Sequence, residues 1–414
     1  MRMHWIHALG IAVALTLAAG PLHASDALFS PLDDAGSPEK AFNLDNSFQA
    51  LITNPSTASV QVVRARAEVL TSKTAALTLN LAPGLELRAH RVDAYFAKSG
   101  ALVWAGVLAD PASAIVPFSP QSLQFDPINS VMLVKNGDKI TGNVHFAGEW
   151  YKIRPLRTGG HAIVAVDLSA MPPDHPAEYG RLRTIPMPAG APAKVDTVIR
   201  VMVHYTPAAA SASGDISGLI DLAVAESNQG YTNSGVFIDL ILAHKSQISY
   251  TESSSFSTDL SRYRGTSDGY MDSIHTTRNS VAADVGLIII NNTQYCGLAS
   301  GIGSTASSAF AAVYWDCATG YYSFAHEIGH LQSARHDPAT DPSTTPYAYG
   351  HGYRYTGTPK WRTIMAYNCT GGCPRLNYWS NPNKLYNGVP MGTTSQSDNT
   401  RVLNNTRATV AAFR

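Results

Sequence analysis

The chain has 414 residues, 45% of them hydrophobic, which is enough for two or three packed domains. Only 14% of the residues are charged, and the formal net charge is zero. This composition offers no basic stripe for nucleic acid and no charged tail, and no stretch beyond the N-terminus is long and apolar enough to be transmembrane. We therefore expect neither nucleic acid nor a membrane among the partners.

The first 24 residues have the pattern of a secretory signal peptide. Arg2 supplies a positive charge, residues 6–19 form an apolar run that is too short to span a bilayer comfortably, and Ala24 is a small residue before a cut. Leu22 fits the small-x-small rule for cleavage poorly. We expect residues 1–24 to direct bacterial export, so that the protein is secreted; an N-terminal anchor or a core helix is the alternative.

Short segments rich in β-forming residues follow. Residues 25–54 are mixed in character and predict a loop, whereas the next hundred residues alternate in part like half-buried strands. Asn136-Gly137-Asp138 predicts a hairpin. The pattern indicates a small all-β domain without cysteine, with strands over residues 60–70, 77–81, 85–92, 101–108, 131–134 and 144–153.

Two proline-rich stretches, residues 171–176 and 185–194, separate this region from the rest of the chain. The second is small in composition and has neither a strand nor a helix period, as expected of an exposed linker and natural processing site. We place the boundary there, which makes residues 25–194 a β-rich propeptide and residues 195–414 a second domain.

The second domain alternates strands and helices. Strands are predicted at residues 197–206, 236–243, 285–290 and 310–315, and the last is expected at the sheet edge, where it could hold an extended substrate by strand addition. Asp215 and Gly235 are start and stop signals for a helix between them, and residues 257–282 are mainly helical. A helix opens at Tyr322 or Ser323, and another closes the chain at residues 405–413. This order predicts an α/β domain with a mixed, twisted sheet.

The run from His326 to His336 has the pattern H-E-x-x-H-x-x-S-x-x-H. On a helix, His326 and His330 lie one turn apart on one face, so two ring nitrogens can bind one zinc ion. Glu327 points beside the metal, where its carboxylate can take a proton from water. His336 reaches the same ion only if the chain turns sharply after about Gln332. The pattern predicts a catalytic zinc with three histidine ligands and an open position; the alternative is a solvated helix with surface histidines.

All four cysteines lie in the last third of the chain, and export makes disulfides the expected state. Four cysteines allow three pairings, and we favour Cys296 with Cys317 and Cys369 with Cys373 because each pair closes a short local loop. A metal site at Cys369 and Cys373 is the weaker alternative, since the histidines already supply a metal site.

The run from His326 to His336 resembles the zinc helix of the metzincin clan of zinc endopeptidases, which carries the motif H-E-x-x-H-x-x-G-x-x-H. The clan also holds a methionine in a tight turn beneath the zinc, and residues 363–367 match that turn, with Met365 at its centre. In the astacin and serralysin branches a tyrosine two residues later assists the reaction, and Tyr367 has that place. Further runs look like bacterial secreted metzincins of the peptidyl-Asp metalloendopeptidase type, and the resemblance covers nearly all of residues 195–414; the runs are 205–209, 262–272 and 367–378.

The resemblance implies a secreted zinc endopeptidase that is made as a zymogen. Glu327 would accept the proton of the attacking water and pass it to the leaving amine, while Tyr367 would donate a hydrogen bond to the oxyanion. It also implies a preference for Asp on the C-terminal side of the cut. Arg375 is our candidate for the cation that binds this Asp, with Arg354 and Arg362 next; a structural or surface arginine is the alternative.

Two features depart from the clan pattern. Ser333 replaces the turn glycine, and a positive φ would cost a serine on the order of 1–2 kcal/mol there. Many relatives block their zinc with a propeptide cysteine, but no cysteine precedes Cys296. The propeptide is still expected to inhibit the enzyme, and Asp174 and His175 could offer a ligand, although such residues belong more often to a loop turn.

Two other functions remain open. A secreted binding or adhesion protein on a degenerate protease scaffold would share the fold, but the intact ligands and base argue against it. A zinc hydrolase of a non-peptide substrate would share the metal site and differ in its products. Structural calcium would suit a secreted protease, yet Asp284, Asp316 and Asp337 form no D-x-D-x-D-G loop, so we do not assign a calcium site.

Overall fold

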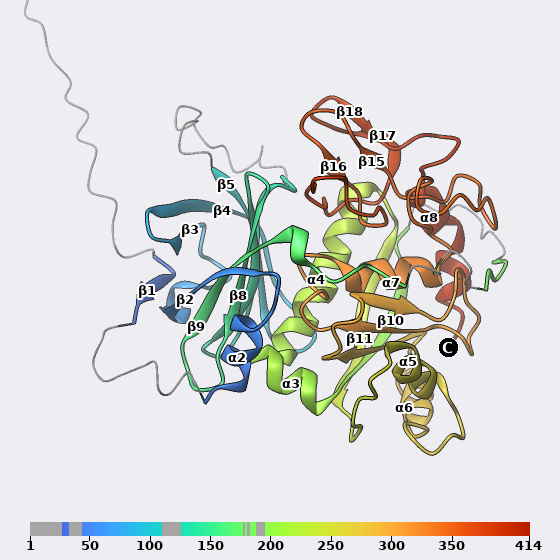
Figure 1. Ribbon diagram of the computed structural model, residues 1–414, viewed down its shortest axis with the longest axis horizontal. Coiled ribbons are helices and arrows are strands. Elements are labelled where there is room, and N and C mark those ends of the chain that lie inside the picture. Colours follow the sequence, from blue (N-terminus) through green and yellow to red (C-terminus); the bar gives the residue numbers. More distant parts are fainter. Residues whose placement is uncertain (1–26, 33–43, 110–125, 177–178, 180–182, 188–194) are drawn as a thin grey trace, which may run out of the picture.

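The computed structural model describes residues 27–32, 44–109, 126–176, 179, 183–187 and 195–414. The predicted signal peptide, residues 1–24, and most of the predicted linker, residues 185–194, lie outside the described residues. Two bodies pack side by side, one built from an antiparallel sheet and one from a mixed sheet with helices (Figure 1). None of the described helices is long and apolar enough to cross a membrane.

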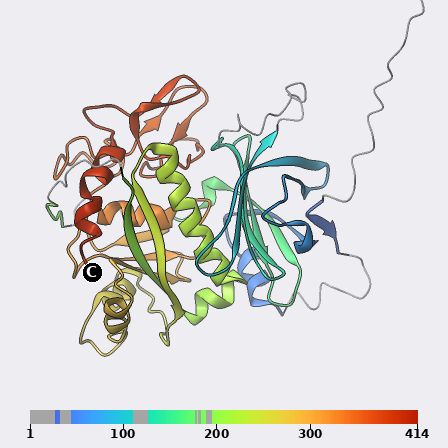
Figure 2. The same cartoon turned by 180° about the vertical axis from the view of Figure 1, so that it is seen from behind.

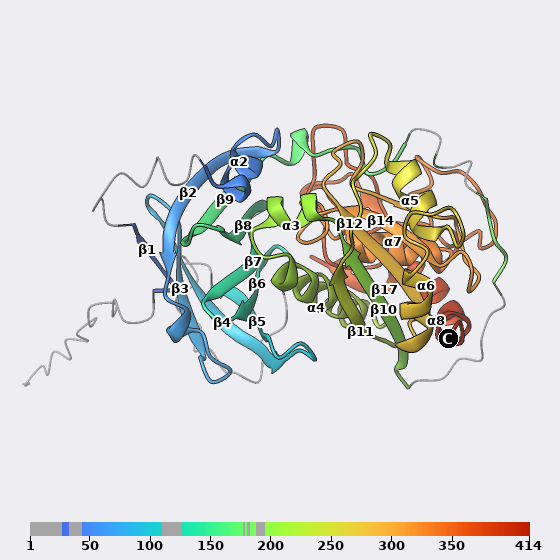
Figure 3. The same cartoon turned by 90° about the horizontal axis from the view of Figure 1, so that it is seen from below.

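The first body is a single sheet in the strand order β1-β2-β9-β8-β7-β6-β5-β4-β3, and every neighbouring pair is antiparallel. The backbone N–H of Leu28 donates to the carbonyl of Thr78 at 2.9 Å, so the sheet curls until its two ends meet around a shared core (Figure 3). Alternate side chains such as Leu77 and Leu79 fill that core. The strands are β1 Phe29–Pro31, β2 Thr57–Ala65, β3 Ala76–Ala82, β4 Leu85–Phe96, β5 Leu102–Ala109, β6 Asn129–Asn136, β7 Lys139–Phe146, β8 Glu149–Pro155 and β9 His161–Val166.

The expected β-rich region is therefore present, with differences in detail. Helix α2, Asn46–Ile52, lies in the stretch expected to be a loop, and Asp45 caps it by accepting from Ser47 N at 2.8 Å. The single strand predicted over residues 144–153 is wrong, because a turn at residues 147–148 splits it into β7 and β8. Strand β9 was not predicted. The hairpin at residues 136–139 is confirmed, with Asn136 paired to Lys139.

The second body has a five-stranded sheet in the order β11-β10-β12-β14-β13. The first four strands run parallel, and β13 is antiparallel at the edge. The prediction that residues 310–315 form the edge is wrong, because β13 comes from a stretch rich in glycine and serine that shows no strand pattern. The strands are β10 Thr197–Tyr205, β11 Ile238–Gln247, β12 Val285–Ile290, β13 Gly297–Ala299 and β14 Phe310–Tyr314.

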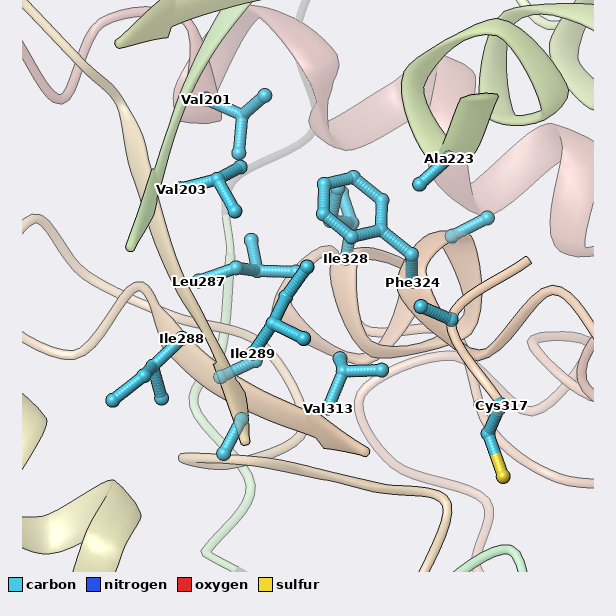
Figure 4. Packing of buried hydrophobic residues seen from close by; sticks show 14 of the residues in the cluster. Val201, Val203, Ala223, Leu287, Ile288, Ile289, Val313, Cys317, Phe324 and Ile328 are labelled. Carbon is cyan, nitrogen blue, oxygen red and sulfur yellow. The ribbon is translucent and has the colours of Figure 1, made fainter. Parts of the chain in front are cut away.

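Helices cover both faces of this sheet. Helices α4, Ile216–Ser234, and α7, Ser323–Leu331, lie on one face, and α5, Phe256–Arg264, and α6, Ile274–Ser280, lie on the other (Figure 1). Phe324 and Ile328 of α7 point at the sheet in a fully buried cluster (Figure 4). The remaining elements are η2 Ala67–Val69, η5 Leu168–Ala170, α3 Pro207–Ser213, β15 Arg354–Tyr355, β16 Trp361–Arg362, β17 Asn381–Tyr386, β18 Val389–Met391 and α8 Asn399–Val410.

The joint between the two bodies is buried and combines apolar packing of β5 and β6 against Leu222 and Ala225 of α4 with polar contacts. Helix α4 lies between them (Figure 2), and beyond it Lys152 of β8 pairs with Asp316 at 2.6 Å, with both side chains about 1% exposed. Asn143 of β7 donates to Glu226 of α4 at 2.6 Å. These contacts dock the first body against the loop that immediately precedes α7, and so beside the histidines that α7 carries.

Candidate metal centre

Three histidines converge where α7 ends. His326 and His330 lie on α7, which stops at Leu331, and the chain then reverses at Ser333, whose φ is 75°. The Nε2 atom of His336 consequently lies 3.2 Å from Nε2 of His326 and 3.0 Å from Nε2 of His330. The structure thus has the sharp turn that the sequence requires, and it holds a serine in the left-handed region.

Backbone carbonyls orient two of the rings. His326 Nδ1 lies 2.9 Å from the carbonyl oxygen of Ile364, and His330 Nδ1 lies 2.9 Å from that of Ala334. A carbonyl oxygen only accepts, so each Nδ1 carries the hydrogen and each Nε2 turns its lone pair to the centre. Burial lowers the pKa of His326, His330 and His336 well below the ordinary value, which favours neutral rings. Neutral imidazoles with converging lone pairs fit a metal ion.

A fourth histidine lies on the same centre. His175 belongs to the proline-rich stretch before the linker, and its ring centroid is 4.9, 5.0 and 4.7 Å from those of the other three. The ligand atoms of all four lie within 4.8 Å of one another. The ring of Tyr179 lies against that of His175, with 3.9 Å between the centroids and 33° between the ring planes. The sequence offered Asp174 and His175 only as weak candidates for a ligand, because no period or motif surrounds them, and the structure places His175 at the centre.

Glu327 is fully buried beside this cluster. Its Oε1 lies 2.8 Å from Nε2 of His175, and its Oε2 has no hydrogen-bond partner among the described residues. Gly297 of the edge strand faces it closely, since a Cβ there would lie 2.2 Å from Oε1. Burial raises the pKa of Glu327, while His175 acts in the opposite direction. Only glycine at position 297 leaves room for this carboxylate.

Met365 and Tyr367 approach the histidines from the other side. A Cβ added to Gly329 would lie 3.1 Å from Met365 Sδ and 2.6 Å from the ring of Trp379. The sulfur of Met365 therefore lies directly against α7. The ring of Tyr367 is 4.5 Å from that of His336, and its hydroxyl is 3.4 Å from His175 Nδ1. Burial and the nearby carboxylates raise the pKa of Tyr367, so its hydroxyl keeps its proton. The sequence did not indicate Trp379.

The three candidate arginines separate into two groups. Arg375 Nη2 lies 2.7 Å from Asp174 Oδ2, and Arg362 Nη1 lies 3.5 Å from the same oxygen. Arg354 instead pairs with Asp337 at 2.6 Å. Burial would raise the pKa of Asp174, but Arg375 and Arg362 hold it below its ordinary value. Asp174 is therefore a buried carboxylate between two buried guanidinium groups.

Both disulfides flank the centre. The structure joins Cys296 to Cys317, which ties the start of the edge strand to the loop before α7, and the Cα atoms are 5.3 Å apart. It joins Cys369 to Cys373, which closes the loop between Tyr367 and Arg375, and the Cα atoms are 5.4 Å apart. This is the pairing that the sequence favours.

Comparison with known proteins agrees with this geometry. Residues 195–380 match the model Reprolysin_5, metallo-peptidase family M12. A "Peptidyl-Asp metalloendopeptidase" of Stenotrophomonas maltophilia (strain K279a) is 54% identical over 422 residues, which cover 98% of this chain and 97% of that protein. One of Xanthomonas campestris pv. campestris is 54% identical over 377 residues, 89% of each chain. One of Pseudomonas fragi is 56% identical over 189 residues, which cover 46% of this chain and all of that protein. The chain therefore belongs to the family of peptidyl-Asp metalloendopeptidases and is a metalloendopeptidase with an M12 catalytic domain.

Proposed function

We propose that this protein is a secreted, zinc-dependent endopeptidase, made as a zymogen, that prefers Asp on the C-terminal side of the cut. The convergence of the Nε2 atoms of His326, His330 and His336 carries this proposal. Nitrogens bound at 2.0–2.1 Å to a tetrahedral zinc lie roughly 3.3 Å apart, close to the 3.0 and 3.2 Å between these atoms. Calcium takes oxygen ligands, so an all-nitrogen set favours zinc.

The residues around the centre divide the chemistry between them. When bound, zinc supplies a Lewis acid that polarises the peptide carbonyl and makes water more acidic. Glu327 accepts a proton from the attacking water and passes it to the leaving amine. Tyr367 donates a hydrogen bond to the carbonyl oxygen as its negative charge grows. Met365 takes no chemical step and forms an apolar floor under the imidazoles.

In this proposal α7 is the zinc helix of a metzincin, and residues 363–367 are its methionine turn. The contact between Met365 and the position of Gly329 supports the second assignment. Residues 1–24 are a signal peptide, 25–194 a propeptide, and 195–414 the protease domain. Two disulfides support export to an oxidising compartment, and the position of residues 171–176 over the centre supports a zymogen.

The preference for Asp rests on the names of the relatives and on the pocket of Arg375. The relatives are called peptidyl-Asp metalloendopeptidases. In this chain, Arg375 and Arg362 already hold a carboxylate close to Glu327 and the histidines. A guanidinium group binds a carboxylate with directed hydrogen bonds, which suits a pocket that selects an acidic side chain.

Glu327→Gln tests the proposal, because it keeps the shape of the side chain and removes the base. We expect the variant to bind one zinc per chain, measured by mass spectrometry of the metal, and to hydrolyse an Asp-containing peptide on the order of a thousandfold more slowly. His330→Ala should lose the zinc as well. Activity that survives a zinc chelator, or that persists in Glu327→Gln, would contradict the proposal.

Asp167→Asn is a suitable control. Asp167 is exposed and caps the short helix η5, where it accepts from the N–H of Ser169 at 2.8 Å. This variant should bind zinc and hydrolyse the peptide as the unaltered chain does. Analysis of the products would separate a peptidase from a zinc hydrolase of another substrate.

A further inference from the structure

The stretch at residues 172–176 is held at the centre by its backbone as well as by its side chains. The N–H of Cys296 donates to the carbonyl of Pro173 at 2.9 Å, and the N–H of Gly297 donates to the carbonyl of Asp174 at 3.2 Å. These donors lie at the start of β13, the edge strand of the sheet. An open strand edge offers its backbone groups to an added peptide. Here the chain's own proposed propeptide, called the leader below, accepts these hydrogen bonds through residues 173 and 174.

The side chain of Asp174 fills a pocket whose cations have no other carboxylate within the described part of the chain. Arg375 and Arg362 both pair with Asp174. The other arginine pairs near the centre differ, because the partners of Arg335 and Arg354 are Asp341 and Asp337, which belong to the protease domain itself. Release of the leader would therefore remove the carboxylate from one pocket only.

The pocket does not depend on Asp174 for its shape. Arg375 Nη1 donates to the carbonyl of Tyr321 at 2.8 Å, and Arg362 Nη1 donates to the carbonyl of Ala366 at 2.8 Å. Both guanidinium groups also lie against the Tyr321 ring, with Cζ at 4.2 Å and 5.1 Å from its centroid. These contacts all stay within residues 195–414. The two guanidinium groups would stay oriented and lose their carboxylate partner, which favours capture of another carboxylate.

We propose that Asp174 is an internal substitute for the substrate aspartate, bound by Arg375 with support from Arg362 in the pocket that selects Asp, and that His175 beside it blocks the centre. This inference rests on the proposed function. It makes Arg375 the specificity-determining residue and the leader a competitor for the substrate site. Asp174 positions residues 172–176, which we call the plug, and the neighbouring imidazole of His175 prevents turnover.

The contacts of His175 explain how an Asp-containing segment can occupy the site without being cut. Its Nε2 lies 2.8 Å from Glu327 Oε1, and its Nδ1 lies 3.4 Å from the Tyr367 hydroxyl. These are the two groups that the proposed reaction needs for the proton and for the oxyanion. A single imidazole thus occupies the base and the electrophilic helper together.

Asp174→Asn in the full chain tests the plug, with Asp167→Asn as the matched control. The substitution keeps the shape and removes the charge. In metal-free protein, hydrogen exchange at the amides of Cys296 and Gly297 should become at least tenfold faster, and in zinc-loaded protein the initial hydrolysis of an Asp-containing peptide by the unprocessed chain should rise at least tenfold. Asp167→Asn should change neither. Unaltered exchange and unaltered latency in a folded Asp174→Asn chain would overturn the proposal.

Arg375→Gln tests the pocket, with Arg354→Gln as its control. The ratio of kcat/KM for an Asp peptide to that for the matching Asn peptide should fall at least a hundredfold in Arg375→Gln and stay within about twofold in Arg354→Gln. Should Asp174→Asn fail to fold, a synthetic Pro-Pro-Asp-His-Pro peptide added to the enzyme as secreted gives a second measurement. It should inhibit at least tenfold more strongly than the peptide with Asn in place of Asp, and equal inhibition would contradict the proposal.

These measurements also separate this inference from the proposed function. Faster hydrogen exchange in Asp174→Asn without hydrolysis by any chain would support the plug and count against the peptidase. Zinc-dependent hydrolysis that Glu327→Gln abolishes, together with an unaltered Asp-to-Asn ratio in Arg375→Gln, would support the peptidase and remove the pocket assignment.

Discussion

The carboxylate of Asp337 accepts a hydrogen bond from the backbone N–H of Tyr367, with 3.0 Å between Oδ2 and N. Its other oxygen pairs with Arg354 at 2.6 Å. Asp337 directly follows His336 in the chain, so one buried side chain connects the third histidine to the loop that carries Tyr367. This carboxylate fixes the distance between a candidate metal ligand and the hydroxyl that would assist the proposed reaction.

Asp337→Asn should therefore impair positioning more than metal binding. The amide can still accept from Tyr367 but loses the charged pair with Arg354, and we expect kcat to fall about tenfold with zinc content unchanged. Steady-state kinetics together with metal analysis measure the two effects. Loss of zinc in parallel with activity would show instead that Asp337 mainly holds His336.

Tyr367→Phe removes only the hydroxyl. We expect kcat to fall roughly tenfold to a hundredfold with little change in KM, because the hydrogen bond to the oxyanion forms in the transition state. Tyr270→Phe is a control, since Tyr270 is 50% exposed and its hydroxyl accepts from Arg262. A rise in KM with constant kcat in Tyr367→Phe would assign the hydroxyl to substrate binding.

Ser333→Gly should stabilise the folded protein. Ser333 has a φ of 75°, and its buried hydroxyl oxygen has no hydrogen-bond partner among the described residues. Glycine relieves the backbone strain and removes this oxygen, while the more flexible unfolded chain offsets part of the gain, so we expect a net increase of about 1 kcal/mol in the free energy of unfolding. Urea denaturation measures it.

Ser333→Ala separates the two causes, because alanine removes the hydroxyl and keeps the strain. It should be less stable than Ser333→Gly. Equal stabilities would show that the backbone at this turn relaxes without cost.

Glu226 should make stability depend on pH. It is buried in the joint between the two bodies, where Oε1 accepts from Asn143 at 2.6 Å and Oε2 from the N–H of Gly320 at 2.8 Å. Burial raises the pKa of Glu226 from 4.5 to about 7. Between these values the native state keeps a proton that the unfolded chain releases, so stability falls as pH rises, by roughly 3 kcal/mol over the whole interval, and then levels off.

Glu226→Gln should remove this contribution. The difference in free energy of unfolding between the unaltered chain and the variant, measured at pH 5 and pH 7.5, isolates Glu226 from the histidines that also titrate. Glu149→Gln, on an exposed residue of β8, should leave the slope unchanged. A difference that is independent of pH would mean that Glu226 titrates normally in the joint.

Local spacing made the metal centre predictable. Residues three to four apart on a helix share a face, so the spacing of His326 and His330 is enough to predict their common direction. Helix ends were also predictable from local sequence. Asp215 and Gly235 were expected to begin and end a helix, and the structure confirms them as the caps of α4. The spacing also required a sharp turn after about Gln332, because a continuing helix would carry His336 away from the other two histidines, and the resemblance to the metzincin clan placed that turn at Ser333.

Contacts between distant segments could not be predicted in this way. The edge strand β13 has no alternating pattern, and its strand pairing comes from β14 rather than from its own residues. Its neighbour was therefore mistaken for the edge. The split between β7 and β8 was missed because apolar residues continue on both sides of the turn.

The sequence by itself determined the candidate site, since a helix converts the spacing of His326, Glu327 and His330 into one geometry. Only the tertiary structure decided what covers that site. His175 meets Glu327 across 152 residues, and Asp174 meets Arg375 across 201 residues. These contacts form because the whole fold leaves certain buried charges and a strand edge without partners, and a distant segment supplies the partners.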